Sequence, residues 1–268
     1  MTPDGFVSTS LAKRMIARMR TAHQRRRIAI FSGPPGIGKT TAIDAFRSSE
    51  AQSVVAVKIA RRNAKEVLVL QHALEEFRQT ISRSARAVPS SIWELRRYLF
   101  QEICSWTGAD IAEVKAGRYA PTDAHRLTLV FDEAQNLSRE AIEVMRFWND
   151  ADRCYAPFPL GLVFVGNNEF SLQVDGDGQS PISAAVADRA LYVEAFDYAD
   201  LTDDDLRMFI QGRGVTDPTA QTAILRIYRA PRAVRSFRRV QDLLDDLNAV
   251  TDGRPITGHT VREAMEFG

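Results

Sequence analysis

The chain has 268 residues, 45% of them hydrophobic and 26% charged, which is enough for one large domain with a small satellite and excludes a disordered or fibrous protein. Its net charge of +1 at pH 7 excludes no partner, because nucleic-acid binding depends on a local basic patch. No run approaches the roughly 18 apolar residues that cross a bilayer, and the N-terminus lacks a basic segment followed by an apolar stretch, so we expect a cytoplasmic protein with no membrane partner.

Apolar periodicity predicts alternating helices and strands along most of the chain. Leu11, Met15 and Met19 recur at helical spacing and predict an amphipathic helix over 9–23. The elements predicted next, in chain order, are a strand at 27–31, a helix at 39–47, a strand at 53–60, helices at 64–81 and 90–106, a strand at 126–131, a helix after Ser138, and strands at 160–165 and 191–195. This alternation predicts an α/β fold with a parallel sheet covered by helices on both sides.

From about residue 200 the pattern changes to helices alone. They are predicted at 203–212, 218–228 and 230–247, with a short one after Thr260. We therefore predict three parts, which are an N-terminal amphipathic helix at 1–24, an α/β core at 25–199 and a small helical lid at 200–268.

A phosphate-binding motif lies between the strand at 27–31 and the helix at 39–47, where the sequence fits G-x-x-x-x-G-K-[ST]. Glycines there let backbone N–H groups surround phosphate oxygens at a helix N-terminus. Lys39 would reach the β- and γ-phosphates of ATP, and Thr40 would ligate Mg²⁺. A glycine turn between strand and helix is the alternative, but it leaves the Lys-Thr pair unexplained. The residues expected to bind ATP are Gly33, Pro34, Pro35, Gly36, Ile37, Gly38, Lys39, Thr40 and Thr41.

Two carboxylates, Asp132 and Glu133, end the apolar strand at 126–131. Ligands of open α/β sheets bind at the carboxyl ends of the strands. Asp132 would hold the magnesium shell, and Glu133 would polarise the attacking water as general base. An acidic pair after a strand is otherwise most often a helix cap, but the P-loop about 90 residues upstream favours the functional interpretation.

These motifs together carry a family resemblance. With the P-loop, D-E-A-Q-N-L-S at 132–138, V-G-N at 165–167 and a Pro-Arg-containing segment at 230–235 in this order, the chain resembles AAA+ ATPases of the transposition-regulator group. That group includes the phage Mu B, TniB and TnsC proteins. The resemblance covers about residues 25–245, and related ATPases in secretion and replication initiation share much of it. It implies an AAA+ P-loop sheet followed by an all-helical lid.

The strand at 160–165 ends in Gly166-Asn167-Asn168, which is similar to the sensor 1 position of AAA+ proteins. An amide there would lie beside the γ-phosphate if this strand is the neighbour of the strand that ends at Asp132. We favour Asn167 over Asn168, and an Asn-rich turn is the alternative.

Two arginines resemble further AAA+ features. Arg189, just ahead of the last strand, resembles an arginine finger that reaches the nucleotide of a neighbouring subunit, and a surface arginine paired with Asp188 is the alternative. Arg232, in the Pro-Arg segment, stands where a sensor 2 arginine is expected, with Arg235 as its competitor. A charged lid surface is the alternative for this segment.

The resemblance implies an ATP-dependent DNA-binding ATPase. Such a protein assembles on double-stranded DNA as a filament or ring, recruits or stimulates a transposase, and is released by hydrolysis. An arginine that acts in trans requires a homo-oligomer, and a head-to-tail contact that does not close gives a filament. A scaffold or signalling ATPase of the secretion or defence type remains an alternative, as does a replication-initiator or helicase-loader type.

The DNA contacts are expected from the ATPase core. About 24 residues precede the first strand, too few for a separate helix-turn-helix domain. By topology, Arg61, Arg62 and Lys65 follow the second strand, on the loop and helix that face DNA in such assemblies. Their contacts would be to phosphates, independent of base sequence and sensitive to salt. A solvated helix start is the alternative.

Overall fold

The structure is a computed structural model that describes residues 6–122, 124–150, 156–168, 182–230 and 233–266. The chain folds into two compact units. The first unit contains residues 16–32 and 43–195, and the second contains the residues up to 15, residues 33–42 and the residues from 196 onward. Within the described residues, no helix combines the length and the apolarity needed to span a membrane.

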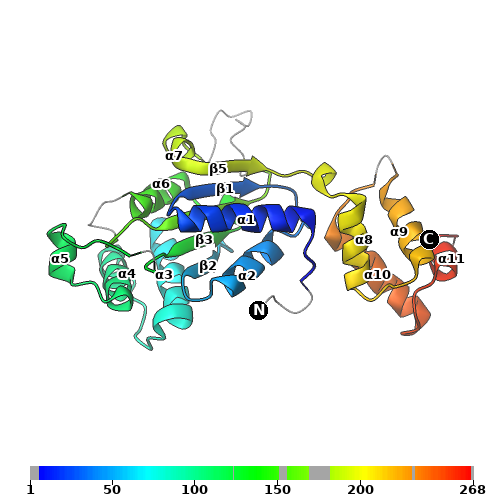
Figure 1. Cartoon of the computed structure of the whole chain (residues 1–268), viewed down its shortest axis with the longest axis horizontal. Helices are drawn as coiled ribbons and strands as arrows, with labels where there is room; N and C mark the ends of the chain where they lie inside the picture. Colours follow the sequence, from blue (N-terminus) through cyan, green and yellow to red (C-terminus); the bar gives the residue numbers. More distant parts are fainter. Residues whose placement is uncertain (1–5, 123, 151–155, 169–181, 231–232, 267–268) are drawn as a thin grey trace. The chain divides into compact units, whose positions relative to one another are not determined.

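A parallel five-stranded sheet in the order β2-β3-β4-β1-β5 forms the centre of the first unit (Figure 1). The strands are β1 (Ile28–Ser32), β2 (Val54–Lys58), β3 (Thr128–Asp132), β4 (Gly161–Gly166) and β5 (Ala190–Ala195). Every residue of β1, β3 and β4 is buried, whereas β5 lies at one edge and is largely part-exposed. The predicted parallel sheet is confirmed.

Helices cover both faces of this sheet. The helices of this unit are α1 (Ser10–Gln24) and α2 (Lys39–Ser49), each shared by the two units, and α3 (Glu66–Phe77), α4 (Ile92–Thr107), α5 (Ile111–Lys115), α6 (Arg139–Asn149) and α7 (Ala184–Arg189). The short α5 packs against α4 and not against the sheet. The side chains of Ser91 and Ser138 accept hydrogen bonds from backbone N–H groups of α4 and α6, as N-caps do. The predicted helix at 64–81 is divided, because α3 ends at Phe77 and a π-helical turn, η1 (Arg78–Ser82), follows it.

The core of the first unit has two layers. On one face, Val57, Phe131 and Phe164 pack with apolar residues of α3, α4 and α6, and the two phenylalanine rings stack with centroids 5.2 Å apart. The right-handed crossover from β1 to β2 places α2 on the other face, and α1, which precedes β1, lies on the same face, in front of the sheet in Figure 1. There, His23 of α1 contacts Phe46 of α2 edge-on, at a ring distance of 6.0 Å.

The second unit is mainly helical beyond residue 196. Its elements there are a short 3₁₀ turn, η3 (Tyr198–Asp200), and the helices α8 (Asp203–Gly212), α9 (Pro218–Tyr228), α10 (Phe237–Thr251) and α11 (Gly258–Glu266). The prediction of a helix at 230–247 was wrong at its start. Ser236 is the N-cap of α10, and its side chain accepts a hydrogen bond from Arg239 N, so the helix begins at Phe237.

Candidate functional site

The loop 33–38 connects β1 to α2 and surrounds an ammonium group. Lys39 Nζ donates hydrogen bonds to Gly33 O at 2.7 Å and to Pro34 O at 2.8 Å. Gly36 and Gly38 have φ of 79° and 94°, a region that L side chains rarely adopt. Lys39 and Thr40 begin α2, so the loop combines a cation, backbone N–H groups and a helix N-terminus, as an anion site does.

Within the second unit, the start of α10 lies against this loop. Phe237 N donates to Gly36 O at 2.8 Å. A Cβ added to Gly36 would lie only 3.0 Å from Arg238 Cβ, so the exposed Arg238 is close to the phosphate-binding backbone. Arg238 was not among the residues predicted for the site, and the sequence around it shows only that arginines are frequent there.

Of the two arginines proposed for the sensor 2 role, only Arg235 lies within the described residues. Arg232 lies outside the described residues. Arg235 donates to Asp203 Oδ1 at 2.6 Å, and Arg229 donates to Oδ2 of the same carboxylate at 2.7 Å. The hydrogen bonds from Arg229 and then Arg235 lower the pKa of Asp203. Arg235 therefore ties the segment before α10 to α8.

A small cavity of about 60 Å³ lies beside the loop in the second unit. Its lining includes Thr41 of α2, Phe6 and Val7 before α1, and the rings of Phe209 and Phe237, which stack with centroids 4.8 Å apart. Ligand pockets usually measure about 300–1,000 Å³, so a nucleotide base could enter only if these side chains moved apart. Thr41 was predicted to bind ATP, whereas its proximity to the residues before α1 was not predicted.

In the first unit, the strand pairing puts three functional strand ends at one edge of the sheet. Asp132 at the end of β3 is in register with Val165 of β4, and Gly166 at the end of β4 is in register with Ser32 of β1. Gly33 follows Ser32 in the sequence, so the P-loop begins at the end of β1. β4 is the neighbour of β3, which meets the condition set for Asn167 in the sequence analysis.

The Asp132-Glu133 pair is held by a tight turn. Asp132 is 7% exposed, and its Oδ1 accepts a hydrogen bond from Glu133 N at 2.9 Å. Glu133 is in the left-handed region, with φ of 57°, immediately before the 3₁₀ turn η2 (Ala134–Asn136). A non-glycine residue keeps this conformation only where its surroundings over-determine it, a feature concentrated at functional sites.

Gln135 joins this turn to the end of β4. Its Nε2 donates to Glu133 Oε2 at 2.6 Å, and its Oε1 accepts from Asn167 N at 3.0 Å. Gln135 belongs to the D-E-A-Q stretch, but no role was predicted for it from the sequence. Only the adjacency of β3 and β4 shows that this side chain reaches both expected catalytic residues.

The loop 59–65 projects from the β2 edge of the sheet and carries Arg61 and Arg62. Both side chains are exposed, and neither forms an ion pair with a carboxylate among the described residues. The loop backbone is anchored at its two ends, where Asn136 Nδ2 donates to Ile59 O at 2.7 Å and Ala64 N donates to Asn136 O at 2.8 Å.

The start of α4 extends this basic loop with an aromatic side chain that the sequence analysis missed. Arg96 pairs with Glu66 at 2.6 Å, and Ile92 lines the same cavity, about 540 Å³ in volume, as Lys65. Trp93 is 64% exposed, and the Arg97 guanidinium carbon lies 4.8 Å from the centre of its ring. Exposed cations and an exposed indole therefore lie on adjoining segments. The cations are Arg61, Arg62 and Lys65 of the loop 59–65, and the indole is that of Trp93 on α4.

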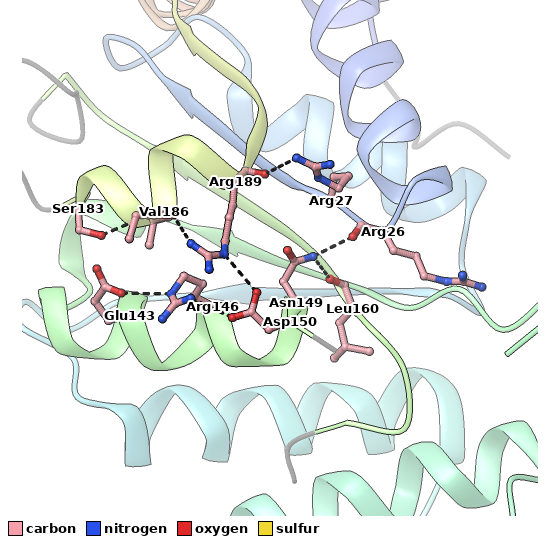
Figure 2. Close-up of polar contacts among 11 residues, drawn as sticks. Arg26, Arg27, Glu143, Arg146, Asn149, Asp150, Leu160, Ser183, Val186 and Arg189 are labelled. Carbon is pink, nitrogen blue, oxygen red and sulfur yellow. Dashed lines mark hydrogen bonds and ion pairs between the residues drawn. The ribbon is translucent and has the colours of Figure 1, made fainter. Parts of the chain in front are cut away.

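Arg189, the last residue of α7, takes part in a polar cluster on the first unit (Figure 2). Its Nε donates to Asp150 Oδ1 at 3.2 Å and its Nη1 to Ala185 O at 3.1 Å, while its side chain stays 40% exposed. Arg146 donates to the other oxygen of Asp150 at 2.9 Å. The partner of Arg189 is therefore Asp150 of the segment after α6, and not Asp188 as the alternative assumed.

Comparison with protein-family models matches residues 21–174 to the AAA domain family. This match covers more than half of the chain and includes the P-loop, Asp132, Glu133 and Asn167. A search of curated proteins found no match to the sequence.

Solved structures with a similar fold include the RuvB Holliday junction branch migration motor of Thermotoga maritima, at 15% identity and a TM-score of 0.55, covering 99% of this chain and 72% of that one. Cdc6p from Pyrobaculum aerophilum has 15% identity and a TM-score of 0.53, over 85% of this chain and 56% of that one. A Drosophila ORC structure bound to DNA has 14% identity and a TM-score of 0.56, over 99% of this chain and 62% of that one. At such identities the likeness concerns the fold alone.

Proposed function

Since the chain belongs to the AAA domain family, we propose that it is an ATPase that assembles on duplex DNA and regulates or recruits a transposase. The order of the strands carries this proposal. β4 stands between β3, which ends in the acidic pair, and β1, which leads into the P-loop. An amide, two carboxylates and a phosphate-binding loop thus follow three neighbouring strands, as an open α/β nucleotide site requires.

The proposed reaction is the hydrolysis of ATP to ADP and phosphate. A water oxygen forms a bond to the γ-phosphorus while the bond from phosphorus to the β,γ-bridging oxygen breaks, and the water proton passes to Glu133. Lys39 binds the β- and γ-phosphates, and Asn167 orients the γ-phosphate or the water. Arg232 is proposed as the sensor 2 arginine, and Arg238, whose Cβ lies near Gly36, is a second candidate for a lid arginine.

Thr40 and Asp132 fit a magnesium ion by the chemistry of their oxygens. Mg²⁺ is usually bound through one or two protein oxygens together with substrate phosphates, not by a protein cage. The described residues contain no cluster of three or more His, Cys, Asp or Glu that could hold a metal by themselves. When bound, the ion would neutralise charge on the phosphates.

Arg189 is proposed to act on the nucleotide of a neighbouring subunit in a homo-oligomeric filament or ring. Its 40% exposure leaves part of the guanidinium accessible from outside the subunit. Its bond to Asp150 means that it would exchange an intramolecular carboxylate for a phosphate when subunits meet. Such a contact makes hydrolysis depend on assembly.

The DNA-binding surface proposed here consists of Arg61, Arg62, Lys65 and the adjoining Trp93. Their exposure supports contacts to backbone phosphates, which are independent of base sequence. Two of the similar structures add support, because one is a Holliday junction motor and another was solved on DNA. The transposase partner rests on the resemblance to transposition regulators.

Binding to a labelled random-sequence duplex tests the coupling between nucleotide and DNA. With Mg²⁺ and a non-hydrolysable ATP analogue, the protein should bind the duplex more tightly than without nucleotide. Lys39→Ala should lose this gain, because it removes the cation from the phosphate loop, whereas the exposed Lys115→Ala is the matched control. If Lys39→Ala shows the same gain in affinity as the unmodified protein, the proposed coupling is wrong.

Electron microscopy with ATP, in the presence and absence of plasmid DNA, separates the competing functions. Filaments or rings that form only on DNA support the proposal, and assemblies that ignore DNA favour a scaffold or signalling ATPase. Stimulation of hydrolysis by a transposase would support the proposed partner. Specific binding to a replicative helicase would favour a helicase loader.

A further inference from the structure

We propose that Gln135 is a positioning residue that holds the Glu133 carboxylate against the end of β4 and so links the general base to Asn167. The inference rests on the proposed role of Glu133. It is carried by two hydrogen bonds of one side chain, Nε2 to Glu133 Oε2 at 2.6 Å and Asn167 N to Oε1 at 3.0 Å.

The chemistry of the two partners dictates which way the amide faces. A backbone N–H is only a donor, so the Asn167 side of Gln135 must present the carbonyl oxygen. The amide nitrogen then faces Glu133 and donates to a carboxylate that accepts. In this orientation Glu133 accepts a hydrogen bond, as a general base that takes a proton from water must be able to do.

The backbone on either side of Gln135 holds it in place. Asn136 N donates to Glu133 O at 2.9 Å, and Leu137 N donates to Ala134 O at 3.0 Å, which closes the turn. Ala134 is fully buried. Asn136 is in turn bound to Ile59 and Ala64, so Gln135 projects from a segment that is anchored to both ends of the loop 59–65.

Two consequences follow for the reaction. Glu133 has a left-handed backbone and is half-buried, so its carboxylate depends on a side-chain partner for its direction. Because the other end of Gln135 is bonded to the β4 end, a shift of Asn167 on meeting the γ-phosphate would move the carboxylate as well. Misplacement of a catalytic group by about 1 Å can cost about a hundredfold in rate.

Three variants of the full chain test the inference. Gln135→Met keeps the length of the side chain and removes both hydrogen bonds. It should lower kcat by roughly ten- to a hundredfold and leave KM and the Kd for a magnesium ATP analogue within about twofold. Glu133→Gln is the reference for loss of the base. Gln79→Glu, on the exposed side of η1, is the control for an added carboxylate.

Gln135→Glu gives a readout that a purely structural role would not produce. Its new carboxylate can still accept from Asn167 N but meets the Glu133 carboxylate, and two adjacent carboxylates share a proton. The acid limb of the pH–rate profile should therefore move to higher pH, with rate recovering as pH rises. Gln79→Glu should leave the profile unchanged.

The outcomes are distinguishable. If Glu133→Gln hydrolyses ATP as fast as the unmodified protein, the proposed base is wrong. If Glu133→Gln is inactive but Gln135→Met retains full kcat, or Gln135→Glu leaves the acid limb in place, then the positioning role of Gln135 is overturned. Loss of nucleotide binding or a large drop in Tm in both Gln135 variants, with an unshifted pH profile, would assign the residue to folding and overturn the inference too.

Discussion

Two arginine-bearing regions stand at opposite edges of the same sheet. Arg61 and Arg62 follow β2, the strand at one edge, and Arg189 directly precedes β5, the strand at the other. Arg189 is bound to Asp150 and to a backbone carbonyl within its own subunit (Figure 2), whereas Arg61 and Arg62 project from an anchored loop without a carboxylate partner among the described residues.

The difference indicates two kinds of phosphate contact. An arginine that has an internal partner presents its guanidinium in one orientation and gives up that partner only for a well-placed group, as a contact to a single nucleotide requires. Exposed arginines on a short loop can meet phosphates at variable positions along a duplex. The first region should therefore control the rate of hydrolysis, and the second the affinity for DNA and its salt dependence.

The largest expected effect comes from Arg189→Ala. Assembled on DNA with saturating ATP, this variant should hydrolyse about a thousandfold more slowly or worse, because arginine fingers contribute about 10³–10⁵ in kcat. Its nucleotide affinity as an isolated subunit should not change. Turnover assays on duplex DNA and nucleotide titrations measure both.

Asp150→Asn is the matched control for this prediction. It removes the carboxylate that holds Arg189, so it should leave the rate of hydrolysis the same or raise it. If Asp150→Asn loses as much activity as Arg189→Ala, with a similar fall in Tm, the pair acts in the fold of one subunit. The Arg189 edge of the sheet would then have no role in hydrolysis by a neighbouring subunit, and the proposed difference between the two edges would be wrong.

A smaller effect is expected from the double variant Arg61→Ala, Arg62→Ala. Each lost phosphate contact flattens the plot of log affinity against log salt by about 0.9, so the slope should change by about 2 units. Hydrolysis without DNA should be unaffected. The double variant Arg254→Ala, Arg262→Ala removes the same charge from exposed positions of the second unit. Equal slopes for the two double variants would show that net charge, and not this loop, governs DNA binding.

Trp93→Ala should have a weaker effect of a different kind. The indole carries no charge, so its loss should reduce DNA affinity by roughly tenfold or less, by loss of apolar and stacking contact, without changing the salt slope. Its 64% exposure predicts little change in Tm. Trp93→Phe should retain most of the affinity. A Trp93→Ala variant that binds DNA like the unmodified protein would remove α4 from the proposed surface.

The features that local sequence could predict are those encoded in short stretches. Buried central strands appear as continuous apolar runs, which is why β1, β3 and β4 were predicted, and the P-loop is a motif of eight residues whose backbone geometry follows from its glycines. The start of α10 was mispredicted because periodicity continues through residues 230–236, while the capping hydrogen bond of Ser236 decides where the helix begins.

The side-chain links of the site could not be predicted in the same way. Gln135 reaches Asn167 across 32 positions of sequence, and this contact requires that β3 and β4 be neighbours. The start of α4, which carries Trp93, meets the start of α3 through the pairing of Arg96 with Glu66, 30 residues apart. Periodicity and spacing contain no information on such pairs, whose members are brought together only by the packing of the sheet and its helices.

The smallest expected effect concerns the sheet that supports both edges. His23 is 5% exposed, and its Nδ1 lies 2.9 Å from Oγ1 of Thr128, at the opposite end of β3 from Asp132. Burial lowers the pKa of His23 below 6.5, and the nearby Arg126 and Arg26 act in the same direction while Glu50 opposes them. Below pH 6.5 the unfolded chain therefore binds a proton that the folded chain resists.

Stability should consequently fall as the pH drops through 6.5 toward 5, by at most about 1.4 kcal/mol per pH unit from this one group. His23→Gln removes the titration but keeps a polar side chain for Thr128. The variant should be less stable at pH 8, because its packing against Phe46 is lost, and should lose less Tm than the unmodified protein between pH 8 and 5. Thermal melts of both proteins across this range make the comparison. Parallel curves would mean that other groups cause the acid sensitivity, and that the buried imidazole gives β3 a polar contact without making the sheet sensitive to pH.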